Sequence, residues 1–235
     1  MQAVILAGGN GVRLYPYTSV IPKPLLPLDD MPIIEIIVKQ LVHHGFTKIS
    51  IASGYLGELI KTYLGNGSKY GVQIDYSIES KPLGTIAPLT LFNNLDSTVL
   101  VIHADLLTTL DFKTLLEFHK EKQAAATVGM ICKSIKSDYG VIDTNGDDLL
   151  EKIREKPEFK MYVNMGIYII ESRILDYLPK KKPQNFPEFI NFLIDRGEKV
   201  AGYRFNGYWL DIGQHCDYDR AVNEFGQYRE EMKID

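Results

Sequence analysis

Short apolar runs alternate with longer amphipathic segments along the first half of the chain. The apolar runs that read as buried strands are 2–6, 48–52, 72–78 and 98–103. The segments that read as helices are 31–44, 56–64, 83–95 and 112–122, the last with Asp111 as its N-cap. Strands that alternate with helices at this spacing predict a mostly parallel sheet with helices on both faces, the α/β class.

The pattern changes after about residue 125 and becomes richer in strands. The predicted strands there are 125–132, 139–144, 149–154 and 161–170, and Asn145-Gly146 predicts a hairpin between the middle two. The chain then returns to a helix at 187–196, a strand at 200–205 and a last helix after Gly213. Because no flexible linker separates the two halves, we expect the second half to pack onto the same sheet, in one domain spanning 1–235.

Composition excludes several classes of protein. A net charge of −4 gives no reason to expect nucleic acid, and the short basic run 180–182 lies between prolines, so we expect a solvated loop there. No run approaches the ~18 apolar residues of a membrane span, and we expect no membrane partner. Cys132 and Cys216 are far apart and outside any CxxC pattern, which favours buried free thiols and a cytoplasmic compartment.

A glycine-rich loop follows the first predicted strand. Residues 6–14 read LAGGNGVRL, and the backbone N–H groups of such a loop suit phosphates. Arg13 and Lys23 would add fixed positive charge against a triphosphate. The loop lacks the third glycine of the dinucleotide fingerprint and the Gly-Lys-Ser/Thr of a P-loop. A purely structural strand-to-helix turn is the alternative interpretation.

Two aspartates follow apolar strand-like stretches. Asp105 comes directly after 98–103 and a single alanine, and Asp211 ends the stretch 208–211. The carboxyl edge of an open α/β sheet is where ligands bind. Two carboxylates meeting there could hold Mg²⁺ together with phosphate oxygens and waters. For either residue alone, a helix N-cap or a turn is an equally good interpretation.

Together these segments resemble the sugar-1-phosphate nucleotidylyltransferases, also called sugar-nucleotide pyrophosphorylases. The signature GGNGVRLYPYT at 8–18 with PKPLLPL at 22–28 carries the resemblance, and further matches follow in the family's order. They are ESKPLGT at 79–85, ADLL at 104–107, YGV at 139–141, EKP at 155–157, VNMGIY at 163–168 and YWLDIG at 208–213. The match covers nearly the whole chain and is closest in character to guanylyltransferase-like members, which weakly favours GTP.

The resemblance implies a nucleotidyltransferase fold, Rossmann-like and similar to the GT-A fold, with a smaller β-rich sugar-binding part. It implies a nucleotide-binding half at about 1–124 and a sugar-phosphate-binding half at about 125–235. The implied nucleotide-binding residues are Leu6, Ala7, Gly8, Gly9, Gly11, Glu79, Pro82, Gly84 and Thr85. The implied sugar-binding residues are Tyr139, Gly140, Glu155 and Asn164.

The implied chemistry joins a nucleoside triphosphate to a sugar-1-phosphate with release of pyrophosphate. Arg13, Lys23 and Lys156 would be catalytic, and Asp105 and Asp211 would hold Mg²⁺. Without the resemblance, Lys156 would be read as an exposed charge at a strand end. Homo-oligomerisation stays open.

Three departures from the family pattern bear on activity. Val12 stands where relatives carry Ser or Thr, His103-Ala104 replaces Asn-Gly, and Ile86-Ala87 replaces Ala-Gly. A catalytically silent, ligand-sensing homologue is therefore the second functional hypothesis. A Rossmann oxidoreductase, the third, fails on its glycine pattern.

Overall fold

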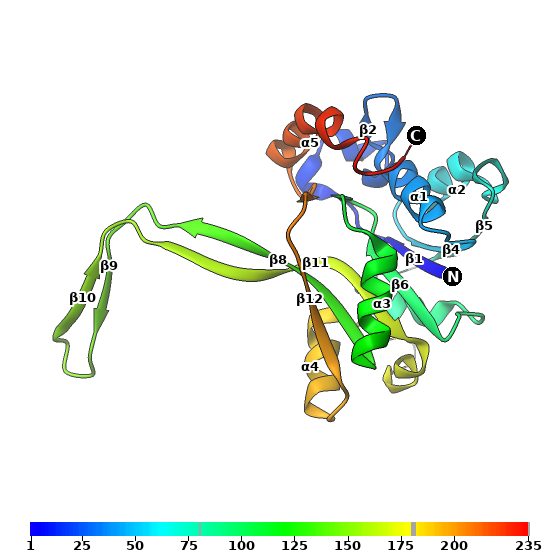
Figure 1. Ribbon diagram of the computed structural model, residues 1–235. Helices are drawn as coiled ribbons and strands as arrows, with labels where there is room; N and C mark the ends of the chain where they lie inside the picture. Colours follow the sequence, from blue (N-terminus) through cyan, green and yellow to red (C-terminus); the bar gives the residue numbers. More distant parts are fainter. Residues whose placement is uncertain (80, 180–181, 235) are drawn as a thin grey trace.

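The computed structural model describes residues 1–79, 81–179 and 182–234. Within these residues seven strands form one sheet in the order β12-β8-β11-β6-β1-β4-β5 (Figure 1). The strands are β1 (Gln2–Ala7), β4 (Lys48–Ser53), β5 (Gln73–Ile78), β6 (Thr98–His103), β8 (Ala126–Lys136), β11 (Glu158–Glu171) and β12 (Val200–Phe205). All run in one direction except β11, which is antiparallel to both of its neighbours. The predicted mixed, mostly parallel α/β sheet is confirmed.

Residues on the central strands alternate between two hydrophobic clusters, one on each face of the sheet. In β1, Ala3 and Ile5 belong to the larger cluster and Val4 to the smaller one, and all three are fully buried. Successive side chains of a strand point to opposite faces, so an uninterrupted apolar run can fill both clusters.

Helices cover both faces. The larger cluster includes side chains from α1 (Ile33–His43), α2 (Gly57–Leu64), α3 (Phe112–Lys122) and α5 (His215–Tyr228). The smaller cluster is closed by α4 (Phe186–Asp195) and by the short 3-10 helices η5 (Ala87–Leu91) and η6 (Ser172–Tyr177).

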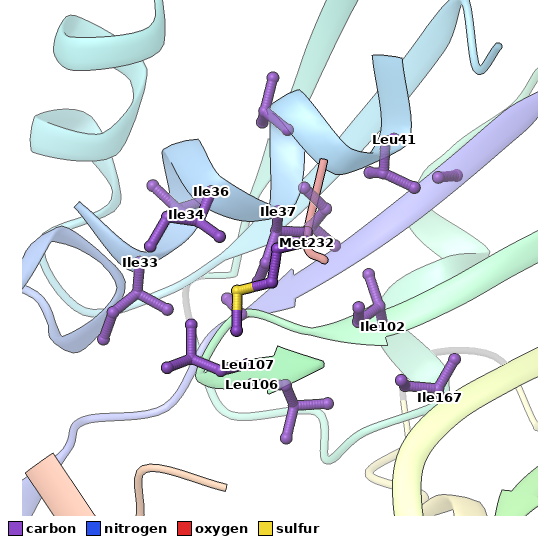
Figure 2. Close-up of a cluster of buried hydrophobic side chains, with 14 of the residues drawn as sticks. Ile33, Ile34, Ile36, Ile37, Leu41, Ile102, Leu106, Leu107, Ile167 and Met232 are labelled. Atoms are coloured by element: carbon purple, nitrogen blue, oxygen red, sulfur yellow. The ribbon is translucent and has the colours of Figure 1, made fainter. Parts of the chain in front are cut away.

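Helix α1 is apolar around most of its circumference because other elements surround it. Its isoleucines share the larger cluster with Met232 near the C-terminus. Figure 2 shows the Met232 side chain between Ile37 of α1 and Leu107. The C-terminal segment therefore covers a face that would otherwise meet solvent, which explains why the helix needs no polar stripe there.

One predicted helix is wrong. The segment 83–95 forms only the 3-10 helix η5. Pro88 lies at the start of η5, and Gly84 lies before it with a φ of 82°. The apolar side chains of Ile86 and Leu89 supplied the helical spacing, but they fill the smaller cluster from a short turn.

The prediction of buried thiols is also wrong. Cys132 and Cys216 are free, as expected, but both are exposed. Cys132 lies where β8 leaves the body of the protein, since β12 pairs with β8 only as far as Ile131. Of the basic run 180–182, only Lys182 lies within the described residues, and it is exposed.

The predicted hairpin forms, but it does not pack onto the sheet as expected. Strands β9 (Val141–Thr144) and β10 (Leu150–Arg154) pair only with each other in a separate two-stranded sheet. The Asn145 side chain closes the turn by accepting hydrogen bonds from the Asp147 and Leu149 N–H groups. Figure 1 shows the hairpin projecting away from the body on the extended ends of β8 and β11.

Within the described residues, none of the helices combines the length and the apolar character needed to cross a membrane.

The N-cap of α3 gives a stability test. The Asp111 carboxylate accepts hydrogen bonds from the Lys113 N–H at 2.8 Å and the Thr114 N–H at 3.1 Å, as the sequence predicted. We expect Asp111→Ala to lower the free energy of unfolding by about 1 kcal/mol, because two helix N–H groups lose their acceptor. Asp111→Asn keeps a capping oxygen and should stay within a few tenths of wild type. Equal losses for both variants in denaturant unfolding would contradict the cap.

Candidate functional site

The glycine-rich loop leaves β1 and turns into the 3-10 helix η1 (Val12–Leu14). The Thr18 hydroxyl holds the turn by donating to the Gly11 carbonyl at 2.8 Å. Val12 and Arg13 are exposed on the outer side of the turn, Val12 with 74% of its surface accessible. The residue at position 12 therefore does not belong to the core beneath the loop.

Lys23 connects this region to the end of β6. It begins the 3-10 helix η3 (Lys23–Leu25), is only 9% exposed, and its Nζ lies 2.5 Å from Asp105 Oδ2. The other carboxylate oxygen, Asp105 Oδ1, is buried and has no hydrogen-bond partner among the described residues. An ionised oxygen without a partner is costly in a protein interior, so a cation beside it would be stabilised.

The second aspartate lies next to the first. Asp211 ends β13 (Trp209–Asp211), which pairs with β7 (Leu106–Thr108) so that Asp211 lies opposite Leu106. The Ile212 N–H donates to the Asp105 carbonyl at 3.0 Å. The Asp211 residue as a whole is exposed at the edge of the sheet, yet the groups packed around its carboxylate, and then the charge of Asp105, raise its pKa. A carboxylate whose ionisation is disfavoured beside a second carboxylate is suited to binding a divalent cation.

The residues present fit Mg²⁺. Among the described residues no three His, Cys, Asp or Glu side chains gather around one point. A magnesium ion does not need such a cage, since it commonly takes one or two carboxylates and completes its shell with phosphate oxygens and waters. The unpartnered oxygen of Asp105 and the adjacent Asp211 supply that set. The guanidinium of Arg13 approaches the same edge, because a Cβ added to Gly213 would lie 3.5 Å from both of its terminal nitrogens.

A cleft of about 280 Å³ lies between the glycine loop and Asp105. Its lining comprises Leu6, Gly8, Gly9, Ala52, Glu79, Pro82, Gly84, Thr85, Pro88, His103 and Asp105. The structure thus brings together most of the residues predicted for the nucleotide, whereas Ala7 and Gly11 are outside the lining. A larger cavity of about 540 Å³ beside η5 and η6 is lined mainly by apolar side chains, and none of its described lining residues is cationic, so this lining does not suit phosphates.

Three residues of the lining were not predicted. Ala52 lies in β4 opposite Leu6 of β1, and Pro88 belongs to the segment that was wrongly predicted as a helix. Neither residue type carries a chemical signal in the sequence. His103 was noticed only as a departure from the family pattern. Its Nε2 is buried without a partner among the described residues, and burial lowers its pKa, which keeps the ring neutral.

The predicted base-binding segment is tied to the second half of the chain. The Glu79 carboxylate accepts a hydrogen bond from the Leu83 N–H at 2.8 Å. Burial raises the pKa of this carboxyl group, and the hydrogen bond from Leu83 only partly offsets that rise. The Thr85 hydroxyl accepts from the Phe186 N–H at 2.8 Å, and the Thr85 N–H donates to the Gln184 carbonyl. Thr85 therefore fixes the segment against the start of α4.

The predicted sugar-phosphate residues are divided between two places. Asn164 stays on the body, where its side chain donates to the Tyr168 hydroxyl and accepts from the Gly166 N–H. The other four, Tyr139, Gly140, Glu155 and Lys156, lie at the base of the projecting hairpin and are exposed. The structure does not bring these four together with Asp105 in the same chain.

Comparison with known proteins now identifies the family. The profile of the nucleotidyl transferase family matches residues 2–227, so the chain belongs to that family. It is 33% identical to a UTP–glucose-1-phosphate uridylyltransferase from Synechocystis sp. over 94% of its length. It is 34% identical to a mannose-1-phosphate guanyltransferase from Candida albicans over 93% of its length. The chain spans 62% of the length of each of these curated relatives.

Solved structures show the same fold. A putative glucose-1-phosphate thymidylyltransferase from Bacillus anthracis, in complex with a sucrose, superposes with a TM-score of 0.75 at 28% identity. That match covers 95% of this chain and 94% of the other. HddC from Yersinia pseudotuberculosis, complexed with GMP-PN, superposes with a TM-score of 0.72 at 25% identity over 95% and 99% of the two chains.

Gly84 gives a test of the cleft wall. A Cβ at this residue would lie 2.4 Å from the Gln184 carbonyl oxygen, whereas one at Gly71, also at positive φ, would meet nothing within 4 Å. We expect Gly71→Ala to lower the free energy of unfolding by about 1 kcal/mol through backbone strain alone. Gly84→Ala adds a backbone clash and should cost about 3 kcal/mol. Equal melting temperatures of the two variants would contradict the close approach of Gly84 to Gln184.

Proposed function

We propose that this protein transfers a nucleotidyl group from a nucleoside triphosphate to a sugar-1-phosphate, forming a nucleoside-diphosphate sugar and pyrophosphate. The observation that carries the proposal is the junction of Lys23, Asp105 and Asp211 beside the cleft at the carboxyl edge of the sheet. Support also comes from the relatives, whose names describe this reaction with UTP or as guanyl transfer. We favour GTP as the nucleotide and place the reaction in the cytoplasm.

In the proposed reaction an oxygen of the sugar phosphate attacks the α-phosphorus of the triphosphate in line. A new P–O bond forms at that phosphorus while its bond to the β-phosphate bridging oxygen breaks, and pyrophosphate leaves with that electron pair. No covalent enzyme intermediate is needed. The protein contributes alignment, which can be worth roughly 7–11 kcal/mol, and neutralisation of charge.

The residues divide this work between them. Backbone N–H groups of Gly8, Gly9 and Gly11 bind the triphosphate, and Glu79 and the segment through Thr85 bind the base. Arg13 stays near the cleft edge as a fixed positive charge. Lys23 would exchange Asp105 for a phosphate oxygen when the nucleotide enters, which frees that carboxylate.

The sugar phosphate would be held by the residues on the second half. Tyr139, Gly140, Glu155 and Asn164 are proposed for the sugar and Lys156 for the attacking phosphate. When bound at Asp105 and Asp211, Mg²⁺ would neutralise charge on the phosphates and help to orient them.

The first test is turnover itself. We expect pyrophosphate release in the presence of Mg²⁺ with at least one pair from a panel of nucleoside triphosphates and sugar-1-phosphates, and triphosphate formation on adding pyrophosphate to the product. Chelation with EDTA should stop the reaction and Mg²⁺ should restore it. Tight nucleotide binding without turnover of any pair would instead favour the catalytically silent, ligand-sensing alternative.

Asp211→Asn tests the carboxylate pair. The amide has nearly the same size, so the fold should persist, but the loss of a metal-ligand charge worth about 3 kcal/mol should lower kcat about a hundredfold or more. Asp219→Asn removes an exposed carboxylate of α5 and serves as the control, with kcat unchanged. Near-normal turnover by Asp211→Asn at ordinary Mg²⁺ concentrations would remove this residue from the site.

Val12→Thr tests the phosphate loop. Val12 is 74% exposed at the position where relatives carry a hydroxyl. A hydrogen bond to a charged phosphate is worth about 1.5–3 kcal/mol, and we expect kcat/KM to rise at least about threefold because the loop has adapted to valine. Val20→Thr changes a valine of 70% exposure outside the loop and should leave kcat/KM unaltered. No gain from Val12→Thr, with an unchanged melting temperature, would place this side chain away from the phosphates.

A further inference from the structure

The projecting segment 132–162, called the arm below, leaves the body as a two-stranded ribbon. Beyond Ile131, β8 has lost β12 and keeps only β11 as a neighbour, from Cys132 opposite Tyr162 to Lys136 opposite Glu158. The hairpin β9–β10 then extends the ribbon (Figure 1). A two-stranded ribbon is at best marginally stable alone in water, so an arm held in this shape needs something to pack against.

The hairpin of the arm has one apolar and one polar face. Ile142 and Ile153 are cross-strand partners, and they remain 54% and 62% exposed, as does Leu150 at 61% on the same face. On the opposite face the Arg154 guanidinium pairs with the Asp143 carboxylate at 2.9 Å. An exposed apolar face backed by a polar one indicates a protein contact.

The arm also carries the residues that the cleft lacks. A Cβ on Gly140 would lie 3.0 Å from Glu155 Oε2, so the two segments that hold Tyr139-Gly140 and Glu155-Lys156 lie side by side. The stretch of β11 from Glu158 to Asn164 is extended and connects these two segments to the body. Six strand residues span about 20 Å, which carries the Lys156 ammonium well away from the cleft of its own chain.

We propose that the arm reaches a second copy of this chain and places Lys156 and Glu155 against the partner's cleft, so that each active site is built from the body of one subunit and the arm of the other. In a two-fold dimer, the arm of each subunit can reach the cleft of the other, so both active sites are completed in the same way. The arm contains nearly equal numbers of acidic and basic residues, which does not suit a nucleic acid or an anionic membrane. This inference rests on the proposed function.

Mixed dimers test the exchange. Lys156→Met leaves the body intact and disables the arm, whereas Asp211→Asn leaves the arm intact and disables the body. We would co-express the two variants with different affinity tags and purify mixed dimers through both tags. With exchanged arms, one of the two sites is complete, and we expect about half of the wild-type specific activity although each variant alone is nearly inactive. Melting temperatures close to wild type show that both variants fold.

The matched control is a mixed dimer of Asp105→Asn with Asp211→Asn, in which both bodies are disabled and no site is complete. If Lys156 serves its own chain, the first mixture is as inactive as this control, and the inference is overturned. If the wild-type enzyme is active but no mixed dimer of the two co-expressed variants can be isolated, the inference is overturned as well. An inactive wild type with every substrate pair would instead overturn the proposed function.

The apolar face of the hairpin gives an independent test by light scattering coupled to size-exclusion chromatography. Ile153→Asn and Lys152→Asn introduce the same side chain at adjacent exposed positions on opposite faces. We expect Ile153→Asn to shift the dimer toward monomer by at least about tenfold in dissociation constant, and Lys152→Asn to leave it unchanged. A monomeric wild type, or equal effects of both variants, contradicts a dimer closed through this face.

Discussion

The contact between Lys23 and Asp105 is the constraint on which the arrangement of the site depends. It joins a residue that follows the first strand to the residue that follows β6, 82 positions further along the chain, at an N–O distance of 2.5 Å. Because β1 and β6 are parallel neighbours, their carboxyl ends meet at one edge of the sheet, and the segment that follows β1 returns Lys23 to Asp105 there. The side chains of Lys23 and Asp105 are 10% and 26% exposed, so losing the carboxylate would leave a largely buried ammonium without its partner. A triphosphate is a ligand that could replace the carboxylate as the partner of Lys23.

The rest of the molecule serves this edge in different ways. The two hydrophobic clusters fix the strands from both faces, and β13 pairs with β7 to bring Asp211 beside Asp105. The segment after β5 forms the opposite wall of the cleft and is anchored by Gly84 and Thr85 against the start of α4. The arm is the exception, because it carries polar residues of the proposed reaction away from this edge. An enzyme assembled from two chains would reconcile a rigid nucleotide site with a distant sugar-phosphate site.

Local sequence patterns predicted most of the helices and strands whose side chains fill the two clusters, because the spacing of apolar residues in those segments matches the side that is buried. They failed at 83–95, where Pro88 and the close approach of Gly84 to Gln184 override a helical spacing of apolar residues. They predicted the hairpin of the arm but not that it leaves the sheet, because Ile142 and Ile153 alternate like half-buried strand residues although both are exposed. The resemblance to a family supplied the order of the motifs. It could not supply the pairing of Lys23 with Asp105, or the buried Nε2 of His103 that has no hydrogen bond among the described residues, because both arise only from packing.

The most direct test of the central claim is the position of the metal. Crystals grown with Mn²⁺ and a non-hydrolysable GTP analogue would reveal the ion by its anomalous scattering, independently of turnover. The account predicts one strong peak within direct ligand distance of the Asp105 and Asp211 carboxylates, with the triphosphate along the glycine loop and Lys23 moved from Asp105 to a phosphate oxygen. A metal bound elsewhere, or a nucleotide bound with the Lys23–Asp105 pair intact and no metal at these aspartates, would contradict it.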